Sequence, residues 1–204
     1  IVVGPTPDNT YAVYVALRDI YTSANNKFGV DLVGAGGCHV NGGSLWGDLA
    51  AWHLGNILDG PNHDAGDHKV IGVDTNANAT YGAGYFIETG GGVYIGQPKG
   101  GQGLNHIKLY PTGSSGNLVV DGGSLETCTG ISADINCQVP WERVAFTGVS
   151  FGVPSAAIAV RNVAGTRNAS GVPNLKDFAI TGCITTSGTL SPIYDIGSVF
   201  NFSV

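Results

Sequence analysis

The chain has 204 residues, of which 43% are hydrophobic and only 12% charged, and its formal net charge is -6 at pH 7. With only 9 Lys and Arg residues it lacks the basic clusters that bind phosphate backbones, so nucleic acid is excluded as a partner. No apolar run approaches the roughly 20 residues needed to span a bilayer, so membrane attachment is expected only through a segment outside this sequence.

The charged fraction is about half the average of roughly 25%. A surface covered by Gly, Ser, Thr and Asn is typical of proteins outside the cytoplasm or of proteins that bury much of their surface against neighbours. We therefore predict a single extracytoplasmic domain over residues 1–204, located extracellularly or at the cell surface. Its first portion, residues 1–60, is predicted to be helix and loop, and its second, residues 69–204, to be rich in β-strands.

Two helices are predicted in the first portion. In residues 11–27, Val13, Leu17 and Ile20 belong to a pattern of apolar steps of three and four, as on one face of an amphipathic helix. Residues 44–58 carry a weaker helical pattern that ends at Asp59-Gly60-Pro61.

Oxygen and imidazole side chains are concentrated in residues 63–80. The stretch from Asp74 alternates oxygen-bearing side chains as the start of a calcium loop does, although it lacks the Gly and Glu of that motif. A surface loop is the preferred explanation of the segment, and a structural calcium ion is the alternative. The candidate ligands are His63, Asp64, Asp67, His68, Asp74, Asn76 and Asn78.

From residue 69 onward, short runs of Val, Ile, Phe and Tyr alternate with Gly, Asn and Ser clusters, which indicates strands and turns. Strands are predicted at residues 70–73, 85–88, 93–95, 106–110, 118–120, 143–147, 157–163, 177–181 and 199–204. With the helices first and the sheet later, the predicted fold class is α+β, an N-terminal amphipathic helix followed by a mainly antiparallel β-rich domain. The 33 glycines show no fixed period that would establish a solenoid.

The four cysteines fit two disulfide bonds, and no Cys-x-x-Cys spacing is present. Cys128 and Cys137 bracket a short polar segment and form the natural local pair, which leaves Cys38 to pair with Cys183. Such bonds persist in oxidising compartments, in agreement with export. Four buried free thiols are the alternative.

Three Asn residues lie in glycosylation sequons, namely Asn78, Asn168 and Asn201. About two such matches are expected by chance in this composition, so the sequons permit glycans without indicating them.

One segment, Gly148-Val149-Ser150-Phe151-Gly152, matches the nucleophile elbow of α/β-hydrolases. That family needs a histidine after the serine, yet all five histidines, from His39 to His106, precede Ser150. A Gly-rich turn between strands is the preferred interpretation, and no catalytic residue is predicted.

Two segments and one cysteine resemble parts of the globular head of a type IV pilin. These are Ala16-Leu17-Arg18-Asp19-Ile20-Tyr21 on the predicted helix, Phe151-Gly152-Val153-Pro154-Ser155-Ala156-Ala157 before a late strand, and Cys183 ahead of Phe200-Asn201-Phe202. The resemblance implies a pilus-like filament subunit.

The leading functional hypothesis is accordingly a non-catalytic subunit of a surface filament, which self-associates into a homopolymer and serves display or adhesion. The alternative is a secreted carbohydrate-binding or carbohydrate-active domain with a glycan as partner. Its candidate residues are the aromatic side chains Trp46, Trp52, Tyr81, Tyr85 and Tyr94 and the acids Asp121, Glu126, Asp134 and Glu142.

Overall fold

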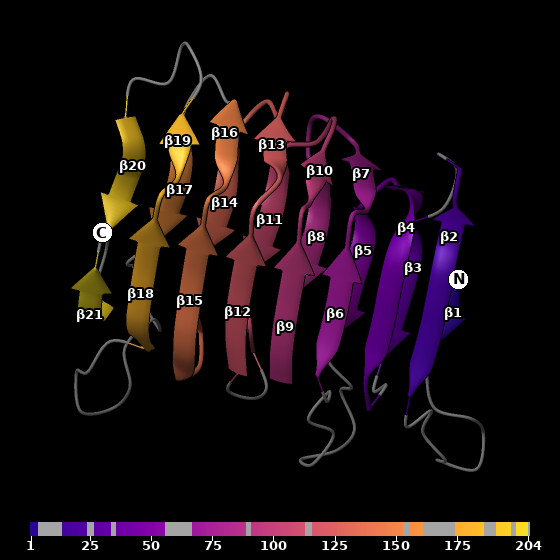
Figure 1. Cartoon of the computed structure of the whole chain (residues 1–204), viewed down its shortest axis with the longest axis horizontal. Helices are drawn as coiled ribbons and strands as arrows, with labels where there is room; N and C mark the ends of the chain where they lie inside the picture. The colour runs from indigo at the N-terminus through magenta and orange to yellow at the C-terminus, as the bar shows by residue number, and fades with distance from the viewer. Residues whose placement is uncertain are drawn as a thin grey trace.

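The chain winds into a parallel β-solenoid (Figure 1). The computed structural model describes residues 1–3, 14–23, 27–33, 36–55, 67–88, 91–112, 116–152, 156–160, 174–185, 191–196 and 199–203. Over these ranges it contains strands and no helix, so it also has no helix long and apolar enough to cross a membrane. Every strand pair within them is parallel, because each turn of the solenoid lies in register on the one before.

Each turn, here called a rung, contributes strands to two facing walls. Sheet A holds eight strands and forms one wall, and sheet B holds thirteen and forms the other (Figure 1). The sheet A strands are β1 (Val2–Val3), β3 (Phe28–Val33), β5 (Ala50–Gly55), β8 (Ala83–Ile87), β11 (Asn105–Leu109), β14 (Ile131–Ile135), β17 (Ala156–Val160) and β20 (Ser191–Ile196).

Sheet B is bent along its length into two parts. The first part holds β2 (Val15–Tyr21), β4 (Cys38–Gly47), β6 (His68–Ile71), β9 (Gly91–Gly96), β12 (Gly116–Asp121), β15 (Trp141–Thr147), β18 (Leu175–Thr181) and β21 (Val199–Ser203). The second part holds β7 (Asp74–Ala77), β10 (Lys99–Gly100), β13 (Ser124–Glu126), β16 (Ser150–Gly152) and β19 (Ile184–Thr185). The long strand β4 crosses the bend, since it pairs with β6 before it and with β7 after it.

One residue per rung makes the bend. Its φ angle is positive, between 47° and 69°, a conformation that Gly adopts without strain and that other residues rarely adopt. By register these residues stand in line along the solenoid, and we call them the bend column: Asp19, Gly42, Gly72, Gln97, Gly122, Gly148 and Gly182.

The core lies between the walls as columns of apolar side chains, each residue stacked on its counterpart in the neighbouring rung. In sheet A one column is completely buried, from Leu32 through Leu54, Ile87 and Leu109 to Ile135. In sheet B a buried column runs through Val40, Val70, Ile95, Val120, Phe146 and Ile180.

The prediction of an α+β fold is wrong, because the predicted first helix contains strand β2 and the predicted second helix covers the end of β4 and all of β5. Residues 11–13, 24–26 and 56–58 of those segments lie outside the described residues. The bend explains the first error. Leu17 and Ile20 both face the core because Asp19 turns the chain between them, so two inward strand positions fall three residues apart and imitate a helical step.

The antiparallel arrangement is also wrong, although each of the nine predicted strands overlaps an observed one. The pilin resemblance falls with the helix, since its segment from Ala16 to Tyr21 lies in strand β2 of an all-β solenoid.

The disulfide prediction is wrong as well, since all four cysteines are free thiols. The five-residue strand β14 lies between Cys128 and Cys137 and keeps them roughly 17 Å apart, far beyond the 7 Å limit for bridging. Cys38 begins β4 and Cys183 follows β18, five rungs further along sheet B, which is about 24 Å at the usual strand spacing.

Candidate functional site

The outer surface of sheet B carries an aromatic platform at Tyr94. Its ring covers Gly96. A Cβ added at Gly96 would lie only 2.7 Å from the ring carbon Cε1 of Tyr94. The hydroxyl donates a 2.9 Å hydrogen bond to Oδ2 of Asp121 on the next rung, and this bond raises the pKa of Tyr94. The tip of a half-buried ring is thus held over Gly96 on the outer side of the sheet.

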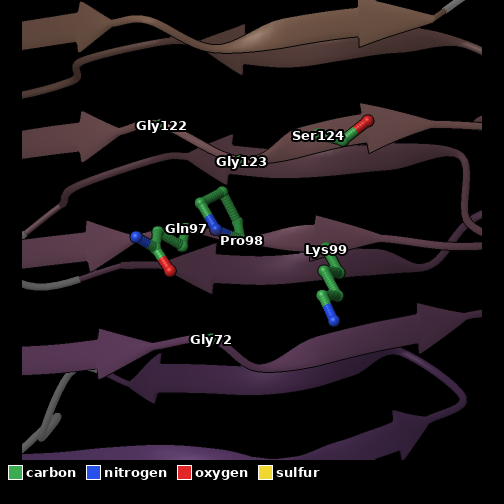
Figure 2. Close-up of a pocket in the computed structure, with 7 residues that line it drawn as sticks. All are labelled: Gly72, Gln97, Pro98, Lys99, Gly122, Gly123 and Ser124. Carbon is green, nitrogen blue, oxygen red and sulfur yellow. The ribbon is translucent and has the colours of Figure 1, made fainter.

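Next to this platform, the bend of sheet B forms a shallow hollow of about 460 Å³ across three rungs (Figure 2). Its wall is made by Gly72 on one rung, Gln97 and Lys99 on the next, and Gly122 and Ser124 on the third. The side chain of Lys99 extends toward the rung of Gly72, whereas the Ser124 hydroxyl points away from it (Figure 2).

The hollow begins where the two strands of the platform, β9 and β12, end. Gly96 ends β9 directly before Gln97, and Asp121 ends β12 directly before Gly122. Lys69 lies beside Tyr94 in register on β6, and its side chain is exposed. The combined surface therefore offers an aromatic ring, an ammonium group, a carboxylate, a hydroxyl and a carboxamide within neighbouring rungs.

A second polar cluster lies on the outer face of sheet A around His53. Its Nδ1 is 2.7 Å from Oδ1 of Asp31 and its Nε2 is 2.8 Å from Oε2 of Glu88, while its ring stacks on Phe28 at 4.1 Å. Burial alone would lower the pKa of His53, but the two hydrogen bonds and the carboxylate charges raise it. An imidazolium that donates to both carboxylates links β3, β5 and the end of β8, and both of its nitrogens are engaged.

Two further histidines point into the solenoid. His106 donates from Nε2 to the carbonyls of Glu126 and Gly101, so its Nδ1 accepts from the Ser132 hydroxyl at 2.7 Å. His68 is 1% exposed, and neither of its ring nitrogens has a hydrogen-bond partner among the described residues. Burial lowers the pKa of His68 to about 4, so it is neutral at pH 7.

The predicted sugar-binding aromatic residues separate into two groups. Trp52 and Tyr85 are fully buried in the core and cannot reach a ligand. Tyr81 is exposed and donates to Asp48, and Trp46 is half-buried on β4. Tyr94 is on β9, the strand that leads directly into Gln97 of the hollow.

The predicted acidic residues are likewise dispersed. Asp121 anchors Tyr94, and Glu126 accepts a hydrogen bond from Ser124 at the edge of the hollow. Glu142 pairs with Lys176 at 2.6 Å, and Asp134 lies on sheet A beside Lys108 in the strand register.

The candidate metal ligands are not brought together within the described residues, where no group of three or more His, Cys, Asp and Glu side chains can hold an ion. His63 and Asp64 lie outside those residues. Asp74 and Asn76 are on strand β7, and Asp67 and His68 are at the start of β6.

Of the sequons, Asn78 follows β7, donates to Asp48 and accepts from the amide of Thr80. Asn201 lies on β21, and Asn168 lies outside the described residues.

The elbow-like segment is the bend of one rung. Gly148 is in the bend column and Ser150 begins β16, in register with Ser124 of the preceding rung. The same apolar-x-Gly-x-Ser pattern recurs at Val120-Asp121-Gly122-Gly123-Ser124. This recurrence is the sequence signal that locates the hollow. Sequence reasoning did not identify Gln97, Lys99 or Ser124 as site residues.

No protein family, characterised protein or solved structure matches this chain. None therefore supports the pilin resemblance, and the self-association of the chain stays a prediction.

Proposed function

We propose that the chain is a non-catalytic glycan-binding solenoid, which binds its ligand on the outer face of sheet B. The observation that carries the proposal is the Tyr94 ring, laid over Gly96 and held by Asp121 at the edge of the hollow. A flat aromatic ring with a polar rim suits the C–H face of a pyranose and the hydroxyls around it.

The neighbouring groups support the same ligand class. Lys69 lies beside the ring in the strand register, and Gln97 and Lys99 are exposed donors that line the hollow. Asp121 and Glu126 are acceptors, bonded to Tyr94 and to Ser124. Such a mixture of donors and acceptors around one apolar surface is typical of sites that fix orientation by a few polar contacts. The prediction of an extracellular location now rests on the scarcity of charge, because the four thiols are free.

A panel of immobilised neutral and acidic polysaccharides, probed with the purified chain, tests the proposal. We expect binding to at least one polysaccharide and its loss in Tyr94→Ala. Tyr81→Ala is the matched control, because Tyr81 is also an exposed tyrosine bonded to an aspartate but lies in the turn before β8. Binding that is absent throughout the panel, or that is lost equally in both variants, would contradict the proposal.

A further inference from the structure

We infer that the ligand is a neutral, linear chain of β-1,4-linked pyranose units that extends along the solenoid axis over the hollow. The inference rests on the proposed function and adds the class of glycan and its orientation. Three features carry it: unpaired peptide groups in the hollow, their repeat along the axis, and the balance of charge around them.

The first feature is a set of backbone groups left out of the strand ladders. Among the described residues, the carbonyls of Gly72, Gln97 and Gly122 accept no hydrogen bond, and the amide of Gly123 donates none. The ladders resume on either side, where Lys99 donates to the Val73 carbonyl and Ser124 to that of Pro98. All four unpaired groups belong to residues that line the hollow, where a ligand's hydroxyls can pair with them.

The second feature is the repeat. Gly72, Gln97 and Gly122 hold equivalent positions on successive rungs, so their carbonyls recur at the strand spacing of about 4.8 Å along the axis. This distance is close to the length of one pyranose unit in an extended chain. Each unit of such a polymer can therefore place its hydroxyls against the unpaired carbonyl of one rung. A single sugar can reach the carbonyl of only one rung.

The third feature is charge. Lys99 stands in register between Asp74 and Ser124, and the Tyr94 platform is bordered by Lys69 and Asp121. Lys99 thus has a carboxylate beside it in the strand register, Asp121 borders the ring on the rung opposite Lys69, and the whole chain carries a net charge of -6. This arrangement favours an uncharged glycan over a polyanion.

Calorimetric titration with cello-oligosaccharides of two to six units tests the inference. We expect the affinity to rise from two to four units and then to level off. The rung after the hollow can be blocked by Gly148→Asn, because a Cβ at Gly148 meets no atom of the described residues within 4 Å and Asn tolerates its φ of 62°. This variant should bind the four-unit oligomer about tenfold more weakly, a change of about 1.4 kcal/mol, and the two-unit oligomer unchanged.

The matched control is Gly182→Asn, which has the same backbone conformation and open surroundings one rung further from Tyr94 and should leave both affinities unchanged. Gly72→Asn blocks the opposite end and replaces Gly148→Asn if that variant does not fold. An affinity independent of length beyond two units, or equal losses for both oligomers, would overturn the inference while the Tyr94-dependent binding stands. Failure of every polysaccharide to bind would instead overturn the proposed function itself.

Discussion

The two faces of sheet B are built on different plans. On the inner face, residues from Val40 to Ile180 repeat one type of side chain along the column, and each is buried. On the outer face, the equivalent column changes at every rung, through His39, Lys69, Tyr94, Val119 and Ala145. The repeat of the inner face is what the solenoid requires, whereas the variation of the outer face confines a binding surface to a few rungs.

Two of the buried histidines, His68 and His53, show the same contrast. His68 faces inward, is neutral and has no hydrogen-bond partner among the described residues, while His53 faces outward and pairs with two carboxylates. Burial dominates the inner site and lowers the pKa, and carboxylates dominate the outer site and raise it. Acid therefore weakens the interior, and alkali weakens the outer cluster.

The largest expected effect comes from the inner face. Phe146 is fully buried and its ring lies 5.9 Å from that of Phe151 and 6.3 Å from that of Phe178. Phe146→Ala should lower the free energy of unfolding by about 3–5 kcal/mol, since it leaves a cavity between rungs. Denaturant unfolding measures it, with Thr147→Ala on the outer face of the same strand as control, for which a change below about 0.5 kcal/mol is expected.

The next largest effect is the loss of folding stability at acid pH. The folded-state pKa of His68 lies below its ordinary value of 6.5, so the unfolded chain takes up a proton first and stability falls as the pH drops from 6.5 to about 4. At 1.36 kcal/mol per pH unit the loss approaches about 3 kcal/mol. His68→Leu should be more stable than the parent protein at pH 4.5 and should reduce this loss; an unchanged loss would show that His68 is not its source.

The loss of folding stability at alkaline pH should be smaller than the loss at acid pH. The pKa of His53 is raised above 6.5, so its stabilisation is complete below pH 6.5 and is lost as the pH rises through the folded-state value. His53→Ala should cost about 2 kcal/mol at pH 6, because it leaves Asp31 and Glu88 facing each other without the shared proton donor. Thermal unfolding from pH 6 to pH 9 measures the difference, which should shrink with rising pH. A constant difference would assign the loss to packing against Phe28 instead.

The smallest expected effect concerns the bend column. A methyl group at Gly148 meets no atom within 4 Å in the part of the chain that the structure describes, so Gly148→Ala should cost only the strain of its positive φ, about 1 kcal/mol. Gly148→Asn should cost less, since its side chain tolerates that conformation. Equal losses for the two variants in denaturant unfolding would argue against the left-handed bend at this position.

Nine of the strands from β6 onward could be predicted from the sequence, because turn residues and short β-branched runs mark them locally. The prediction missed seven others, namely β7, β10, β13, β14, β16, β19 and β20. The parallel pairing of the strands could not be predicted, because it depends on the repeat, and the repeat is irregular. Register partners in the column from Leu17 to Ile180 are 23, 30, 25, 25, 26 and 34 residues apart. The longest steps contain the stretches 56–66 and 161–173, and these hide the period of about 25.

The candidate site was partly foreseeable. Tyr94 and Asp121 were identified as sugar-binding candidates by residue type, but nothing local indicates that they meet, since they are 27 positions apart and join only through the register of β9 and β12. Trp52 and Tyr85 were equally good candidates by type and are buried, because their strand positions face the core. Aligning the bend glycines fixes which positions of sheet B point inward, but Trp52 and Tyr85 are paired on sheet A at unequal distances after Gly42 and Gly72.

The most direct test is to map the bound glycan on the folded chain by NMR, following backbone amide shifts during titration with cellotetraose. The account predicts that the perturbed amides lie on the outer side of sheet B, at Tyr94, Gln97, Lys99, Gly122 and Ser124. Perturbations centred on His53 and Phe86 on the outer face of sheet A, or no perturbation at saturating ligand, would contradict it.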